Sequence, residues 1–174
     1  MTMQEDFGKM VQETMEQLAN GGAFLMTGKP VNPMTIGWLE LGRSWNTPVA
    51  TIFVRRSRFS YENLTKGDGR FTISVPARGT FAKELAFCGT RSGRDCDKMK
   101  ETGMETTPSK TGGVPGVKGC AIQIEGRILY ASELMDLDKF DAEKRAKLYD
   151  TKTWGPDGNP HAMFFAEILD MRRE

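Results

Sequence analysis

Histidine is almost absent from this chain, which has 174 residues and a single histidine, His161. A Ser-His-Asp or Cys-His catalytic pair would depend on that residue alone, and no nucleophile-elbow motif accompanies it. The sequence also lacks a Gly-x-Gly-x-x-Gly fingerprint and a P-loop pattern. If the protein is an enzyme, a bound cofactor is therefore expected to carry the chemistry.

Cysteine is scarce, and its spacing is irregular. Cys88, Cys96 and Cys120 form an odd set in which no pair has Cys-x-x-Cys spacing. A disulfide framework is not expected, and neither is a structural zinc site. Cys88 precedes a glycine, and a cysteine in such a setting is more often a small buried residue than a redox thiol.

Excess charge and long apolar runs are missing as well. The formal net charge of +1 gives no overall field for attracting nucleic acid or an anionic membrane. No apolar run approaches the roughly 20 residues that a membrane helix needs. The first ten residues lack the basic start and apolar middle of a signal peptide, so a cytoplasmic location is expected.

The pattern of apolar residues predicts a mainly antiparallel β protein with short helices (α+β), in one domain over residues 1–174. Residues 4–19 read as an amphipathic helix in an N-terminal segment 1–21, and Gly21-Gly22 supplies the stop. Short strand-like runs follow without regular alternation with helices, which favours a barrel or sandwich. The expected strands are 23–28, 34–41, 48–54, 70–76, 120–131 and 162–171, and the expected short helices are 57–66, 79–87, 92–102 and 136–149. Residues 103–119, rich in Gly, Pro and Thr, form one long loop, and such loops are more often functional than idle.

Two arginine-bearing segments are candidate anion sites. Arg55, Arg56 and Arg58 surround Ser57, which is placed to cap the helix that follows. Residues 92–98 again combine a turn, possible helix caps and basic groups. Each segment alone is explained at least as well by a solvated basic face or a well-capped helix.

The stretch 31–38, "VNPMTIGW", mixes turn, strand and aromatic signals. Asn32-Pro33 indicates a turn, and Met34, Thr35 and Trp38 follow it. A plain hairpin explains this pattern. A rim of small polar and backbone groups around a flat ligand explains it together with the two anion sites. His161 follows a turn-rich loop, and a surface position is as compatible with its sequence as a role in a site.

Taken in order, "NPMTIGW", "PVATIFVRRSRFSYE", "FTISVP" and "ELAFCGTRSGRDCDK" resemble the flavin reductase-like family of FMN-binding split barrels, in its flavoredoxin-like branch. The resemblance runs from about Gly22 to Asp97, returns near His161 and is weakest over 104–160. It implies a six-stranded Greek-key barrel with helical insertions, a homodimer, and FMN near the subunit boundary. Where members often read Arg-Pro-Ser-Arg, this chain has Arg55-Arg56-Ser57-Arg58.

The resemblance also implies roles for individual residues. Asn32, Met34, Thr35 and Trp38 would line the ring and ribityl region of FMN, while Arg55, Ser57 and Arg58 would meet its phosphate. Phe87, Cys88 and Gly89 would edge the ring, and Lys98 would reach the flavin or its phosphate.

Three functions are compatible with these residues. The first is an FMN-dependent oxidoreductase that takes electrons from NAD(P)H or a protein donor. The second is a non-enzymatic FMN electron carrier that docks a redox partner protein. The third is a nucleic-acid surface built on the arginines, which the small net charge and the lack of interleaved aromatic residues disfavour.

Overall fold

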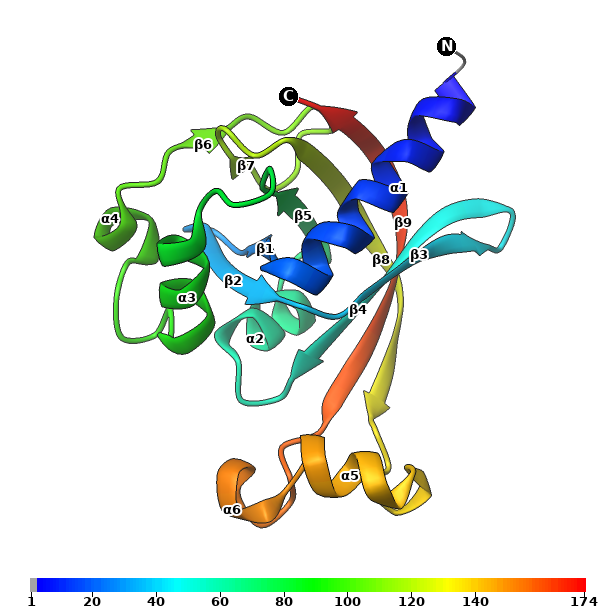
Figure 1. Cartoon of the computed structure of the whole chain (residues 1–174), viewed down its shortest axis with the longest axis vertical. Helices are drawn as coiled ribbons and strands as arrows, with labels where there is room; N and C mark the ends of the chain where they lie inside the picture. Colours follow the sequence, from blue (N-terminus) through cyan, green and yellow to red (C-terminus); the bar gives the residue numbers. More distant parts are fainter. Residues whose placement is uncertain (1–2) are drawn as a thin grey trace.

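A single antiparallel sheet organises the protein, for which the computed structural model describes residues 3–174 (Figure 1). The strand order is β2-β1-β5-β8-β9-β4-β3. Its strands are β1 (Ala23–Thr27), β2 (Asn32–Ile36), β3 (Leu39–Ser44), β4 (Thr47–Arg55), β5 (Arg70–Val75), β8 (Ile122–Leu134) and β9 (His161–Arg173). Every neighbouring pair is antiparallel, which confirms the predicted fold class.

The sheet has seven strands in the described residues, where the sequence favoured about six. The expected strand 34–41 is divided, because β2 ends at Ile36 and β3 begins at Leu39. These two strands form opposite edges of the sheet, so Gly37 and Trp38 carry the chain from one edge to the other. Trp38 therefore lies at a crossing point and not inside a strand.

The turn predicted at Asn32-Pro33 is wrong. The turn occupies residues 28–31, and Asn32 is the first residue of β2, opposite Thr27. Pro33 is tolerated in the strand because β2 is an edge strand, where a missing N–H need not interrupt the sheet. Residues 32–36 of "VNPMTIGW" therefore form the second strand of a hairpin with β1, as the hairpin interpretation expected.

Two apolar clusters fill the space around the sheet. The larger includes Phe71, Phe164 and Met10, and Met10 comes from helix α1 (Met3–Asn20). The predicted N-terminal helix is thereby confirmed, although residues 1–2 of the predicted segment lie outside the described residues. The smaller cluster includes Phe24, Leu85 and Cys88, and it joins β1 to helix α3 (Ala82–Thr90).

Helices α2 (Phe59–Lys66), α3 and α4 (Lys98–Thr102) gather near β1 and β2 (Figure 1). The predicted capping role of Ser57 is wrong, since the N-cap residue of α2 is Arg58 and no side chain caps it. The predicted helix 92–102 starts later than expected, because α4 begins at Lys98 and is capped by Asp97. It ends, as predicted, at Gly103, which has a positive φ of 67°. The long loop 103–119 contains only the short strands β6 (Thr106–Thr107) and β7 (Gly116–Val117).

Strands β8 and β9 have 13 residues each and extend past the rest of the sheet. Residues 135–160, named the arm here, connect their ends and form the lower lobe in Figure 1. The predicted helix 136–149 is divided into a 3-10 turn (Leu137–Lys139) and α5 (Ala142–Leu148), and α6 (Thr151–Trp154) follows. No helix within residues 3–174 is long and apolar enough to cross a membrane.

Candidate cofactor-binding site

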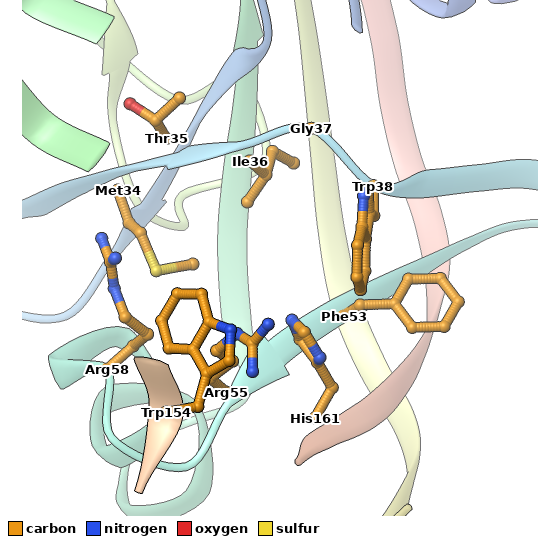
Figure 2. Close-up of a pocket in the computed structure, with 10 residues that line it drawn as sticks. All are labelled: Met34, Thr35, Ile36, Gly37, Trp38, Phe53, Arg55, Arg58, Trp154 and His161. Atoms are coloured by element: carbon orange, nitrogen blue, oxygen red, sulfur yellow. The ribbon is translucent and has the colours of Figure 1, made fainter. Parts of the chain in front are cut away.

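Two adjoining cavities lie where β2, α2, α3 and the arm meet. The aromatic cavity has a volume of about 220 Å³ and is lined by Met34, Thr35, Ile36, Gly37, Trp38, Phe53, Arg55, Arg58, Trp154 and His161 (Figure 2). The basic cavity has a volume of about 120 Å³ and is lined by Asn32, Met34, Ser57, Arg58, Phe59, Ser60, Thr90, Arg91, Ser92, Gly93 and Lys98. Met34 and Arg58 line both, so an elongated ligand with a planar end and an anionic end fits this arrangement.

Aromatic rings form one wall of the aromatic cavity. The centroids of the Trp38 and His161 rings lie 4.7 Å apart, and Phe53 meets Trp38 edge-on. His161 Nδ1 is 2.9 Å from the hydroxyl of Tyr149. Burial and the nearby Arg55 lower the pKa of His161 to about 3, so its imidazole is neutral near pH 7. His161 therefore offers a flat, uncharged surface.

Arg55 links the aromatic cavity to the arm. Its guanidinium donates hydrogen bonds to the carbonyl oxygens of Leu148, Gly158 and Asn159. It also lies over the Trp154 ring, 3.8 Å from the centroid. These contacts occupy its donors and one of its faces, so Arg55 is fixed in place by the arm.

Arg58 and Lys98 supply the charge of the basic cavity. Arg58 donates to the carbonyl oxygens of Gly89 and Cys88, and Lys98 Nζ donates to those of Pro33 and Cys88, at 2.7 to 3.2 Å. Lys98 is 3% exposed. Burial lowers the pKa of Arg58, and it lowers the pKa of Lys98 to about 8.

The surroundings do not balance these two cations. In residues 3–174 neither Arg58 nor Lys98 forms an ion pair with a carboxylate. The carbonyls of Cys88 and Gly89 belong to the end of α3, where a helix dipole supplies roughly half a negative elementary charge. Against two positive groups this leaves an excess of more than one positive charge. Burying such an excess is costly unless an anion joins it.

Close packing shapes the floor of the basic cavity. The amide of Asn32 donates to Ser60 Oγ at 3.0 Å, while its Oδ1 has no hydrogen-bond partner. A Cβ on Gly93 would lie 2.0 Å from that oxygen, so only glycine permits this approach. Ser57 Oγ accepts a hydrogen bond from Asn159 Nδ2 at 2.8 Å, which ties the rim of the cavity to the arm.

The two cavities contain most of the residues that the sequence singled out. Asn32, Met34, Thr35, Trp38, Arg55, Ser57, Arg58 and Lys98 all line one or both. The Thr35 hydroxyl, however, donates to the carbonyl of Leu85 at 2.6 Å. It is therefore already occupied in a contact with α3.

Three predicted ring contacts lie elsewhere. Cys88 is fully buried, and burial raises the pKa of its thiol to about 11, as suits a small core residue. Phe87 packs against the smaller apolar cluster. Gly89 lines a separate hollow of about 500 Å³ between α1 and α3.

Sequence reasoning missed Trp154 and Phe53, which both line the aromatic cavity. Phe53 sits in an ordinary strand pattern, and nothing in its local sequence marks it. Trp154 precedes a turn-rich segment, but its pairing with Arg55 joins distant parts of the chain. His161 is buried at the cavity wall, which decides against a surface position.

The described residues combine an antiparallel split-barrel sheet with a basic cavity beside an aromatic one. The family model described as "Flavin reductase like domain" matches residues 15–174. The chain therefore belongs to the flavin reductase-like family, as its motifs predicted.

Similar proteins agree with this assignment. An uncharacterized protein of Archaeoglobus fulgidus is 29% identical over 112 residues, which are 64% of this chain and 62% of that protein, so less than two thirds of that relative is matched. A flavoredoxin of Desulfovibrio vulgaris superposes with a TM-score of 0.67 and 21% identity, over 89% of this chain and 70% of that one.

Two further solved structures share the fold. An FMN-binding protein of Thermus thermophilus gives a TM-score of 0.65 at 20% identity, over 89% of this chain and 72% of the other. An NADH:FAD oxidoreductase of Streptomyces globisporus gives a TM-score of 0.64 at 18% identity, over 89% of this chain and 76% of the other. At these identities the superpositions establish the fold alone.

Proposed function

We propose that the chain binds FMN, with the phosphate in the basic cavity and the isoalloxazine ring in the aromatic cavity. The observation that carries this proposal is the pair formed by the half-buried Arg58 and the buried Lys98, whose partners in residues 3–174 are carbonyl oxygens and a helix end. A phosphate monoester supplies the missing negative charge and accepts several hydrogen bonds. The FMN-binding protein of similar fold supports this choice of ligand.

The remaining site residues take positions around this arrangement. Ser57 lies on the rim of the basic cavity beside the phosphate, and Asn32 forms its floor. Met34, Trp38 and the backbone at Thr35 line the ring, while Arg55 lies at the ring and not at the phosphate. Phe87, Cys88 and Gly89 act through α3, whose end holds Arg58 and Lys98 in place.

A bound flavin accepts and donates electrons, and the protein provides its surroundings. Trp38 and His161 present flat faces to the ring and exclude water from it. The positive charge of Arg55 at the same cavity favours a reduced ring that carries negative charge. No side chain needs to act as a general acid or base.

We further propose that the protein is an oxidoreductase that passes electrons from NAD(P)H, or from a protein donor, through FMN to an acceptor. The alternative is an electron carrier without its own reductase activity. Trp38 and Trp154 are 40% and 39% exposed at the aromatic cavity, and such an apolar rim suits the docking of a redox protein.

An anaerobic absorbance spectrum separates these possibilities. Purified protein reconstituted with FMN is mixed with NADH or NADPH, and the flavin absorbance is followed. Bleaching by either nucleotide establishes the reductase and identifies its donor. A yellow protein that stays yellow with both nucleotides, yet bleaches with dithionite, is the carrier.

Homodimer formation and a cytoplasmic location stay predictions of the sequence. Analytical ultracentrifugation tests the homodimer.

A further inference from the structure

The arm is fastened to the end of β4 and to the start of β9, beside the wall of the aromatic cavity. Arg55, at the end of β4, donates to three carbonyl oxygens of the arm, and its guanidinium lies 5.0 Å from the centroid of the Tyr149 ring and 3.8 Å from that of Trp154. Two neighbouring residues of the sheet end, Arg56 and Ser57, also contact the arm. Arg56 pairs with Asp157, and Asn159 bonds both the backbone N–H and the Oγ of Ser57.

This anchorage brings a single aromatic side chain of the arm to the cavity. Trp154, the last residue of α6, stacks on Arg55 and lines the aromatic cavity, whereas α5 and α6 bury none of their residues. In Figure 2 the Trp154 indole lies over the Arg55 guanidinium, with Met34 and Arg58 on one side and His161 on the other. Trp38 belongs to the facing wall.

We infer that Trp154 is a specificity-determining residue: it narrows the approach to the ring, so that compact planar electron donors or acceptors reach it and bulkier ones do not. This inference rests on the proposed function. A three-ring flavin would fill much of a cavity of about 220 Å³, so a second reactant would meet it on the exposed side of the cavity. Trp38 and Trp154 are the exposed aromatic side chains of its lining, and we take the space beside them as its mouth. Arg55 is the positioning residue, because it holds Trp154 at that mouth.

The test uses full-length protein reconstituted with FMN and compares Trp154→Ala with Trp45→Ala. Trp45 is a matched control because it is 61% exposed at the β3–β4 turn and packs on Phe165, not at either cavity. Quenching of flavin fluorescence by acrylamide, a neutral probe, reports the accessibility of the ring without turnover. Trp154→Ala is expected to raise the quenching constant several-fold, and Trp45→Ala to leave it at the wild-type value.

Selectivity is measured with chemically reduced protein and a series of quinones with one, two and three fused rings. Each quinone takes two electrons and one proton from the anionic reduced FMN and a second proton from water, and it leaves as the hydroquinone; the rate constant of flavin reoxidation is recorded. In the wild type the rate constants should fall steeply with ring number. In Trp154→Ala the rate constants should depend less on ring number, because reoxidation by the widest quinones should be accelerated the most.

Arg55→Met tests the positioning role while keeping the indole. It should reproduce the flattened selectivity of Trp154→Ala, and the double variant should add little further, because both changes remove one interaction. The ratio of FMN to riboflavin affinity should stay unchanged in Arg55→Met, since Arg55 does not meet the phosphate.

The outcomes separate the two proposals. If FMN does not bind the wild type, the proposed function fails. If FMN binds and Trp154→Ala matches the wild type in quenching and in quinone selectivity, the inference about Trp154 is wrong while the proposed function stands. If Arg55→Met selectively weakens FMN relative to riboflavin, Arg55 is a phosphate ligand and its positioning role is overturned.

Discussion

Lys98 carries a positive charge that the free protein holds at a cost. It is almost fully buried, it donates to the carbonyl oxygens of Pro33 and Cys88, and burial lowers its pKa to about 8. Burying an unbalanced charge of this kind generally costs stability. The proposed phosphate of FMN would supply the anion that balances it.

Replacing this lysine by methionine tests that explanation. Lys98→Met keeps the length of the side chain and removes the charge, so FMN affinity should fall about tenfold to a hundredfold, the equivalent of 1.5–3 kcal/mol for a charge-assisted contact. Fluorescence titration of the apoprotein with FMN measures the change. Lys66→Met is the control, because Lys66 is exposed and pairs with Glu62 outside both cavities. Equal FMN affinities of the wild type, Lys98→Met and Lys66→Met would show that Lys98 does not contribute to FMN binding.

The lowered pKa of Lys98 also predicts a pH dependence of binding. The phosphate favours protonated Lys98, so FMN affinity should fall as the pH rises above about 8, by at most about tenfold per unit. The contribution of Lys98 to the free energy of unfolding should change in the opposite sense. It should rise between about pH 8 and the ordinary lysine pKa, because the unfolded chain then binds more protons.

Titrations with FMN from pH 7 to 9.5 (about the range that brackets this pKa) measure the effect, with riboflavin as the reference for any titration of the ring. The decline should be present in the wild type and absent in Lys98→Met. A decline of the same size in both proteins would assign it to another group.

For individual residues, the sequence predicted which side chains line the cavities better than it predicted what each one contacts there. Arg58 and Lys98 were expected to meet an anion, and both line the basic cavity. The position of Arg55 could not be foreseen, because its partners Leu148 and Trp154 come from a segment without recognisable motifs. The capping role of Ser57 was wrong because Ser57 is bonded to Asn159 instead.

A buried carboxylate holds residues 109–111 of the long loop 103–119. Glu125 of β8 is 1% exposed and accepts hydrogen bonds from Ser109, Thr111 and the backbone of Lys110, and it pairs with Arg172. Burial alone would raise the pKa of Glu125, but these hydrogen bonds outweigh it and hold the pKa at about 2. A charge located outside the loop therefore fixes residues 109–111.

Removing that charge should loosen the loop and destabilise the protein. Glu125→Gln is expected to lower the free energy of unfolding by about 1.5–3 kcal/mol, because several hydrogen bonds to a charged acceptor are weakened. The pKa of Glu125 is lower in the native protein than in the unfolded chain. The contribution of Glu125 to the free energy of unfolding should therefore be fully present above pH 4–5 (about the pKa in the unfolded chain) and be lost as the pH falls towards 2.

Urea denaturation of the two proteins measures the difference. Glu105→Gln is the matched control within the same loop, since Glu105 forms an exposed ion pair with Lys118, and it should change stability by less than about 1 kcal/mol. If the two substitutions have equal effects, Glu125 does not anchor the loop.

Element by element, the sequence predicted strands well where they are buried on both sides. The runs at 23–28, 48–54 and 70–76 correspond closely to β1, β4 and β5. The break at Gly37 was missed because the strand-like pattern continues across it, and only the pairing of β2 and β3 with opposite edges reveals it. Residues 136–149 were predicted as one helix because the N-cap Asp141 lies inside a largely polar stretch.

For the molecule as a whole, membership of the flavin reductase-like family rests on a match over residues 15–174 and agrees with the antiparallel sheet. Four short motifs in order were enough to predict both. Without the motifs, the pattern of apolar runs predicted only a mainly antiparallel protein, and the missing catalytic motifs predicted a cofactor if the protein is an enzyme. The arm over residues 135–160, where the resemblance was weakest, supplies Trp154 to the site.

The central claim is that the basic cavity receives the phosphate of FMN. Isothermal titration calorimetry of the wild-type apoprotein with FMN and with riboflavin, which lacks only the phosphate, tests it most directly. FMN should bind tighter than riboflavin by about tenfold to a hundredfold or more, as charge-assisted contacts to the phosphate require. Equal affinity for the two ligands would show that the phosphate does not occupy the basic cavity, and absence of binding by either would contradict the flavin assignment itself.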